Sequence, residues 1–173
     1  MSESYKIPLA GLKAGRHTFD FEIGDAFFEE FEESEIKQGT LNANVLMEKR
    51  TGLIDLTIEI TGSVIICCDR CLEMFSHPVD CENRLIVKYG QVSEEDDPDI
   101  LTVPAEDSQL DLMQNFYEYI FLDLPIRRVH PDDKEGNSTC DPEMLRKLKE
   151  HIVEEEKHDD PRWDELKKLL SDN

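Results

Sequence analysis

The stretch "TLNANVLMEKRTGLIDLTIEIT", from Thr40 to Thr61, alternates apolar and polar residues on both sides of a short turn. Successive side chains of a strand point to opposite faces, so this two-residue period predicts two strands with one buried face. Gly52 lies in the intervening "KRTG" and suits a hairpin turn. The residues expected on the buried face are Leu41, Ala43, Val45, Met47, Ile54, Leu56, Ile58 and Ile60. The stretch therefore predicts an antiparallel hairpin.

The same alternation continues on either side of this hairpin. In "RHTFDFEI", Phe19, Phe21 and Ile23 share one face, and "RLIVKY" around residues 84–89 predicts another strand. Between them, "GDAFFEEFEE" predicts a short helix with Asp25 as its N-cap. The first half of the chain is thus expected to form a mostly antiparallel sheet, either open or partly closed into a barrel.

The second half of the chain reads as helical. Residues 92–107 are acidic and aperiodic, which predicts an exposed loop. Ser108 with Asp111 resembles a capping box before a buried helix that Pro125 ends. The pairs Asp141–Pro142 and Asp160–Pro161 then predict two more helix starts. We expect a single α+β domain over 1–173, with a sheet-rich region at 1–91, the loop 92–107, and a helical region at 108–173 ending in a mobile tail.

The charge of the chain limits its partners. It carries 40 acidic against 19 basic side chains, a formal net charge of -21. Most non-specific affinity for nucleic acid comes from Lys and Arg, so direct DNA binding is disfavoured and a basic protein is the better partner. An acidity that only confers solubility is the alternative. The sequence has neither a signal peptide nor an apolar run of about 20 residues, which predicts a cytoplasmic protein that does not bind membranes.

Three of the five cysteines stand together in "GSVIICCDRCLEMF". If the strand continues unbroken past Gly62, Cys68 faces inward and Cys67 outward, whereas a bulge at Gly62 would invert this assignment. Cys68 and Cys71 form a C-x-x-C turn that could place two thiolates on one zinc ion. The two further ligands that zinc requires are sought at His130 and Cys140, with Cys81 in reserve.

Other roles for these cysteines remain open. They can pack as small hydrophobes without any cofactor. A bridge between Cys67 and Cys81 is conceivable, although cytosolic thiols usually stay reduced. Redox catalysis is disfavoured, because thioredoxin-like centres place C-x-x-C at a helix start and Pro78 follows too closely for a long helix.

No established catalytic motif occurs in the sequence, so we expect a protein that is not an enzyme. One cationic group stands out in "DLPIRRVHPDD", where Arg127, Arg128 and His130 follow the predicted buried helix. These side chains either pair with nearby carboxylates or form a binding site for a phosphate or another acidic group.

Four motifs, taken in order, resemble the YceD family. They are "CDRCLEMF" at 68–75, "FLDLPIRRVHPDD" at 121–133, Cys140, and "DPRWDELKKL" at 160–169. The resemblance spans most of the chain. Many family members carry further cysteines after the position of Cys140, whereas here a predicted helix follows directly. This departure weakens the case for zinc.

The resemblance implies a non-enzymatic role in large-subunit ribosome biogenesis, in the accumulation or processing of large-subunit ribosomal RNA. The implied partners are a large-subunit ribosomal protein or the precursor particle, and contact with ribosomal RNA is a further option. A zinc-stabilised interaction module in another pathway is the alternative, and an undetected RNA-directed enzyme ranks below both.

Overall fold

The computed structural model describes residues 5–90 and 100–151 of the chain. Seven strands and three helices lie in these ranges. In chain order they are β1 (Lys6–Pro8), β2 (Gly15–Ile23), α1 (Asp25–Glu29), β3 (Gln38–Arg50), β4 (Leu53–Cys67), β5 (Met74–Tyr89), β6 (Ile100–Val103), β7 (Gln109–Asp111), α2 (Met113–Asp123) and α3 (Pro142–His151). In the described residues, no helix is long and apolar enough to cross a membrane.

Five strands form the main sheet, in the order β2-β3-β4-β5-β6. The first four are antiparallel neighbours, and β6 runs parallel to the end of β5. The predicted α+β class with a mostly antiparallel sheet is therefore confirmed. The barrel option is wrong, because β2 and β6 remain as two separate edges. β6 also lies inside the segment 92–107 that was predicted as a loop.

The predicted hairpin between β3 and β4 is present. Arg50 pairs with Leu53, and Gly52 has a φ of 78° in the two-residue turn between them. A positive φ is accessible to glycine without steric cost, so this residue fits the turn. The position of the turn was therefore predicted correctly from the sequence pattern.

The pairing of β4 is unbroken through Gly62, so the sheet has no bulge there. Gly62 pairs with Leu41 on β3 and with Val79 on β5. Its φ is 147°, and a Cβ built on it would lie 2.3 Å from the carbonyl oxygen of Thr40. Because the alternation is preserved, Cys68 is buried and Cys67 is exposed, as predicted.

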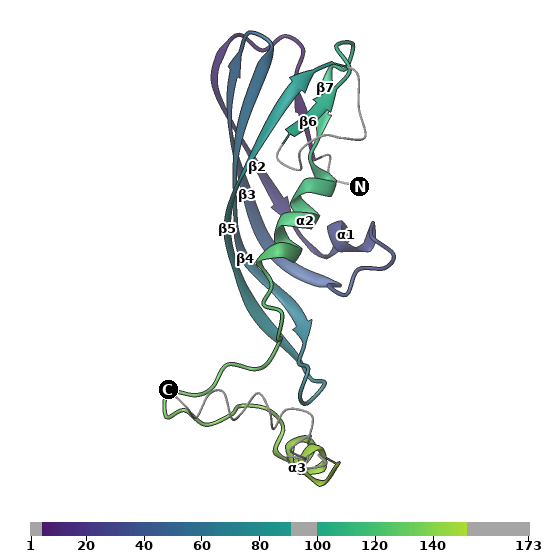
Figure 1. The fold of residues 1–173 in the computed structure, drawn as a ribbon, viewed down its shortest axis with the longest axis vertical. Helices are drawn as coiled ribbons and strands as arrows, with labels where there is room; N and C mark the ends of the chain where they lie inside the picture. Colours follow the sequence, from purple (N-terminus) through teal and green to yellow (C-terminus); the bar gives the residue numbers. More distant parts are fainter. Residues whose placement is uncertain (1–4, 91–99, 152–173) are drawn as a thin grey trace, which may run out of the picture.

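One face of the main sheet forms the core. The helices α1 and α2, with the small sheet of β1 and β7, lie on this side (Figure 1). Phe27 and Phe28 of α1 and Phe116 and Ile120 of α2 are fully buried in one continuous apolar cluster with the inward side chains of the sheet. α3 lies beyond the end of the sheet, near the tip of the β4–β5 hairpin (Figure 1).

Two predicted helix starts are wrong. Gly24 is the N-cap of α1, and Asp25 instead accepts a hydrogen bond from the backbone N–H of Gly39 at 2.9 Å. Ser108 does not begin α2, because the next residues form β7, which pairs with β1. Both sites have the polar residues of a cap, but tertiary pairing of the neighbouring backbone takes precedence.

The helix predicted from Asp141 and Pro142 is confirmed as α3. The Asp141 side chain accepts a hydrogen bond from the backbone N–H of Glu143 at 3.0 Å. The helix predicted from Asp160 and Pro161 and the predicted mobile tail lie outside the described residues.

Candidate functional site

The tip of the β4–β5 hairpin supplies two cysteines. β4 ends at Cys67, and the chain turns through Cys68 to Cys71 before β5 begins at Met74. The turn is closed by a hydrogen bond from the N–H of Leu72 to the carbonyl oxygen of Cys68 at 2.9 Å. Leu72 has a φ of 63°, an uncommon left-handed conformation for a residue with a side chain. This tight turn brings Cys68 and Cys71 to the same side.

The segment after α2 supplies the other two groups, His130 and Cys140. Two hydrogen bonds of 2.7 Å tie this segment to the hairpin tip, one from the N–H of Asp69 to the carbonyl of Arg128 and one from the N–H of Arg128 to the Asp69 carboxylate. The ring of His130 also contacts that of Phe75, with centroids 4.6 Å apart. These contacts place His130 beside Cys71.

The four side chains predicted as metal ligands lie together. The Sγ atoms of Cys68 and Cys140 are 3.7 Å apart, and Nδ1 of His130 lies 3.4 Å from Sγ of Cys71 and 3.7 Å from that of Cys140. All four potential ligand atoms lie within 4.8 Å of one another, and the three cysteines are buried. This cluster could hold a metal ion.

The surroundings of Cys68 favour its ionised form. Burial raises the pKa of the Cys68 thiol, but the backbone N–H groups of Cys71, Arg70 and His130 and the His130 side chain outweigh burial and lower the pKa to about 6. Burial raises the pKa of Cys71 above its usual value. Amide groups directed at a sulfur stabilise a thiolate, which is the form that binds metals.

The remaining two cysteines are not members of the cluster. Cys67 is exposed, and its thiol contacts the carbonyl of Leu72 at 3.5 Å. Cys81 is half-buried beside the carbonyl of Tyr119. All five thiols are free, so the conceivable Cys67–Cys81 bridge is not formed. Cys81 is therefore not needed as a reserve ligand.

The two predicted binding arginines have different environments. Arg128 forms an ion pair with Glu35, and its guanidinium lies 5.8 Å from the centre of the Phe121 ring. Its backbone is also hydrogen-bonded to Asp69. Arg128 therefore contacts the segment before β3, the helix α2 and the tip of the β4–β5 hairpin. Arg127 is exposed beside it. Arg128 thus fits the interpretation of pairing with a carboxylate, and a binding role of Arg127, Arg128 and His130 stays a prediction.

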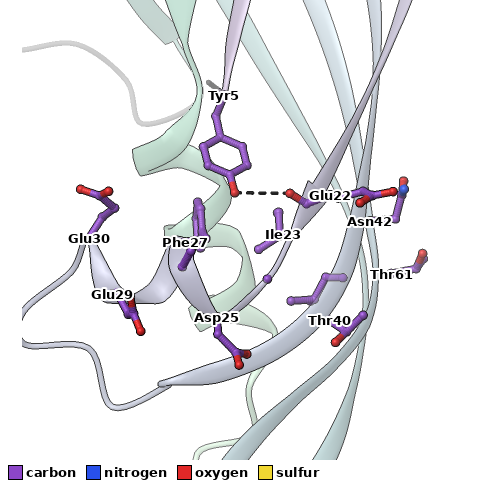
Figure 2. Close-up of a pocket in the computed structure, with 13 residues that line it drawn as sticks. Tyr5, Glu22, Ile23, Asp25, Phe27, Glu29, Glu30, Thr40, Asn42 and Thr61 are labelled. Carbon is purple, nitrogen blue, oxygen red and sulfur yellow. Dashed lines mark hydrogen bonds between the residues drawn. The ribbon is translucent and has the colours of Figure 1, made fainter. Parts of the chain in front are cut away.

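A hollow of about 980 Å³ lies at the end of β2, between the sheet and α1. Figure 2 shows its carboxylates coming from both sides, Glu22 from the sheet and Asp25, Glu29 and Glu30 from α1 and its C-terminal end. Its lining holds no Lys, Arg or His, and within the residues that the structure describes none of these four carboxylates forms an ion pair. The hollow is therefore a strongly negative concavity.

Sequence reasoning did not find this hollow. The sequence signal that could have found it is the acidic run at 29–35, although such runs usually form solvated loops or faces. The other carboxylate, Glu22, belongs to the polar face of β2 and meets this run only because α1 folds back against the end of the sheet.

A family model described as "Large ribosomal RNA subunit accumulation protein YceD" matches residues 56–170. No curated protein and no solved structure matches the chain. The matched range includes all four residues of the cysteine and histidine cluster and begins after the four carboxylates of the hollow.

Proposed function

Because this chain belongs to the YceD family of large ribosomal RNA subunit accumulation proteins, we propose that it acts as a non-enzymatic assembly factor that binds a protein partner on the large-subunit precursor. The family gives the role in accumulation of the large-subunit RNA. How the chain performs this role is our proposal.

The observation that supports a basic protein partner is the acidic hollow. Within the described residues, none of its four carboxylates forms an ion pair with a basic side chain. The whole sequence carries a net charge of -21. Such a surface repels the phosphates of RNA and attracts the Lys and Arg side chains of a basic protein. Ribosomal proteins are typically basic because they bind RNA, so one of them suits this surface.

Sucrose-gradient analysis tests this proposal. In wild-type cells the protein should sediment with large-subunit precursors, and a deletion strain should accumulate less mature large-subunit RNA than small-subunit RNA. Raising the salt concentration during sedimentation should release the protein, because attraction between exposed charges is screened. Recovery only in the free pool, together with normal ribosomal RNA in the deletion strain, would contradict the proposal.

We further propose that Cys68, Cys71, His130 and Cys140 bind one zinc ion with a structural role. In a tetrahedral site with Zn–S bonds of about 2.3 Å, ligand sulfurs lie about 3.8 Å from each other. The Cys68–Cys140 distance of 3.7 Å matches this spacing. In a two-iron cluster the ligand atoms bind two different metal ions, so they must lie farther apart than these four atoms, which are all within 4.8 Å of one another.

The protein's own groups complete the environment that such an ion needs. Nδ1 of His130 faces the sulfurs, which leaves Nε2 as the ring nitrogen that carries the proton. Four protein ligands occupy all coordination positions of a tetrahedral zinc ion and leave none open for a substrate. This is the pattern of a structural site rather than a catalytic one.

Elemental analysis of protein purified without added metal tests the zinc proposal. About one zinc per chain is expected, and loss of any one of the four ligands should lower this content strongly. A metal-free protein with the same stability before and after addition of Zn²⁺ would contradict the proposal.

A further inference from the structure

The metal ligands come in two pairs from two separate regions of the fold. Cys68 and Cys71 belong to the hairpin tip of the main sheet, whereas His130 and Cys140 belong to the segment 125–151 that contains α3. An ion bound by all four would therefore connect this segment to the sheet.

The segment has almost no apolar interior of its own. The structure describes every residue from 125 to 151, and of these Cys140 alone is buried. α3 contains no buried residue, and Leu148 is 41% exposed. Among the described residues, its Met144 and Leu145 pack against the small cluster around the cysteines, which touches the main core through Phe75. A segment that buries so little apolar surface gains little from the hydrophobic effect.

Outside the cysteine and histidine cluster, the described polar contacts between the segment and the rest of the fold are few and lie at one end. They are the two backbone hydrogen bonds of Arg128 with Asp69 and the ion pair of Arg128 with Glu35. From 131 to 151, the only described hydrogen-bonding contacts with the rest of the fold are those of Cys140 and the backbone of Asp141 with the thiols of Cys68 and Cys71. Exposed ion pairs and single hydrogen bonds contribute little net stability, so these contacts do not hold the whole segment.

α3 also needs support from outside. Its described residues carry an Asp141 cap and two ion pairs between their own side chains, Arg146–Glu150 and Lys147–Glu143. Most of the stability of a helix in a protein comes from tertiary packing, and no described residue of α3 is buried. Cys140 directly precedes its cap, so an ion bound to Cys140 would anchor the start of the helix.

We infer that the bound metal ion holds residues 125–151 on the hairpin tip. Loss of the ion then releases this segment while the main sheet stays folded. The inference rests on the proposed zinc site. It makes the chain a stable sheet with a metal-dependent appendage, whose exposed Arg127 and α3 keep a fixed position relative to the sheet only in the metal-bound state.

Hydrogen exchange measured by mass spectrometry on the full chain tests the inference. Under reducing conditions, excess EDTA should raise the exchange of peptides from 126–151 at least tenfold and leave peptides from β2, β3 and α2 unchanged. Addition of Zn²⁺ should restore the original protection. His130→Ala should show the released state without chelator, and Cys67→Ser, which alters a neighbouring thiol outside the cluster, should behave as wild type.

The possible results separate the two proposals. Zinc present by elemental analysis, with unchanged exchange in 126–151 after its removal, would overturn the inference and leave the zinc site intact. Faster exchange throughout β2, β3 and α2 after removal would also overturn it, because the metal would then stabilise the whole fold. Absence of bound zinc would overturn both.

Discussion

Cys68 and Cys140 are 72 positions apart in the chain, and their Sγ atoms lie 3.7 Å apart. They meet in a small apolar cluster with Val129 and Phe75, and Phe75 also packs against the main core. With Cys71 and His130 beside them, they form a preformed ligand set, so their substitution should affect metal content before it affects the core of the sheet.

Replacement of a ligand should remove the metal. Cys140→Ser is expected to lower the zinc content from about one per chain to near zero, because a structural site of three ligands binds zinc far more weakly than one of four. Cys67→Ser is the matched control and should retain the ion. In the wild type, substitution by Co²⁺ should give the visible absorption of a tetrahedral thiolate site. Full zinc retention in Cys140→Ser would contradict the assignment.

Gly62 should not tolerate a side chain. Its φ of 147° and the 2.3 Å approach of a Cβ to the Thr40 carbonyl mean that Gly62→Ala must distort the pairing of β3 with β4. We expect a loss of roughly 1–3 kcal/mol in the free energy of unfolding, measured by urea denaturation. Gly90→Ala is the control, because its φ is not in the left-handed region and the nearest atom to its Cβ, a methyl carbon of Thr102, lies at an ordinary contact distance of 3.4 Å. Equal stabilities of the two variants would show that the strand relaxes around the new methyl group.

Leu72 offers a stabilising substitution. It has a φ of 63° and is 66% exposed, so its side chain contributes little packing while its backbone is strained. The left-handed conformation costs about 1–2 kcal/mol for a residue with a Cβ, and the greater flexibility of an unfolded glycine offsets about 0.5–1 kcal/mol of the gain. Leu72→Gly should therefore raise the midpoint of thermal unfolding slightly. Leu72→Val should lower it, since a β-branched residue fits this conformation less well.

The ion pair of Asp55 with Arg84 should make the free energy of unfolding depend on pH. Hydrogen bonding from the Arg84 side chain lowers the pKa of the Asp55 carboxyl in the folded state. The stabilisation is therefore present above the unfolded pKa of about 3.9 and disappears as the pH falls through the lower folded pKa.

Asp55→Asn tests this pH dependence. It should reduce the free energy of unfolding at neutral pH by about 0.2–1 kcal/mol, the usual range for an ion pair at the protein surface. Its difference from the wild type should be smaller at about pH 3 than at neutral pH, because protonation of the carboxyl removes the ion pair. Urea denaturation at both pH values measures this, and a constant difference would rule out the ion pair as its source.

The carboxylates of the hollow should contribute to partner binding. Glu29→Gln with Glu30→Gln is expected to weaken binding to extracted large-subunit ribosomal proteins roughly threefold to tenfold at low salt, with a smaller dependence on salt. The matched control is Glu106→Gln with Glu135→Gln, which changes the net charge equally at exposed positions that do not line the hollow. Equal weakening by both pairs would show that net charge, and not the hollow, governs binding.

Local patterns in the sequence predicted the strands of the sheet well. The two-residue alternation from Leu41 to Cys68 indicated the buried face of β3 and β4, and Gly52 indicated the turn between them. The same alternation predicted the inward position of Cys68. Each of these features depends on the conformation of consecutive residues, which the order of apolar and polar side chains determines directly.

Features made by distant segments were harder to predict. β6 is four residues long and becomes a strand through parallel pairing with β5, and β7 forms through pairing with β1 near the other end of the sequence. In the sequence, residues 100–103 carry no alternation that distinguishes them from the acidic segment before them. Pairing with a neighbour supplied the stabilisation that local propensity did not.

By itself, the sequence determined the strand pattern, the hairpins and the residue types that can bind a metal. The meeting of His130 and Cys140 with Cys68 and Cys71, and of Glu22 with the carboxylates of α1 around one hollow, depended on the tertiary structure. The physical reason is that side-chain alternation acts over neighbouring residues, whereas contact between distant segments requires the whole chain to close its loops around a common core.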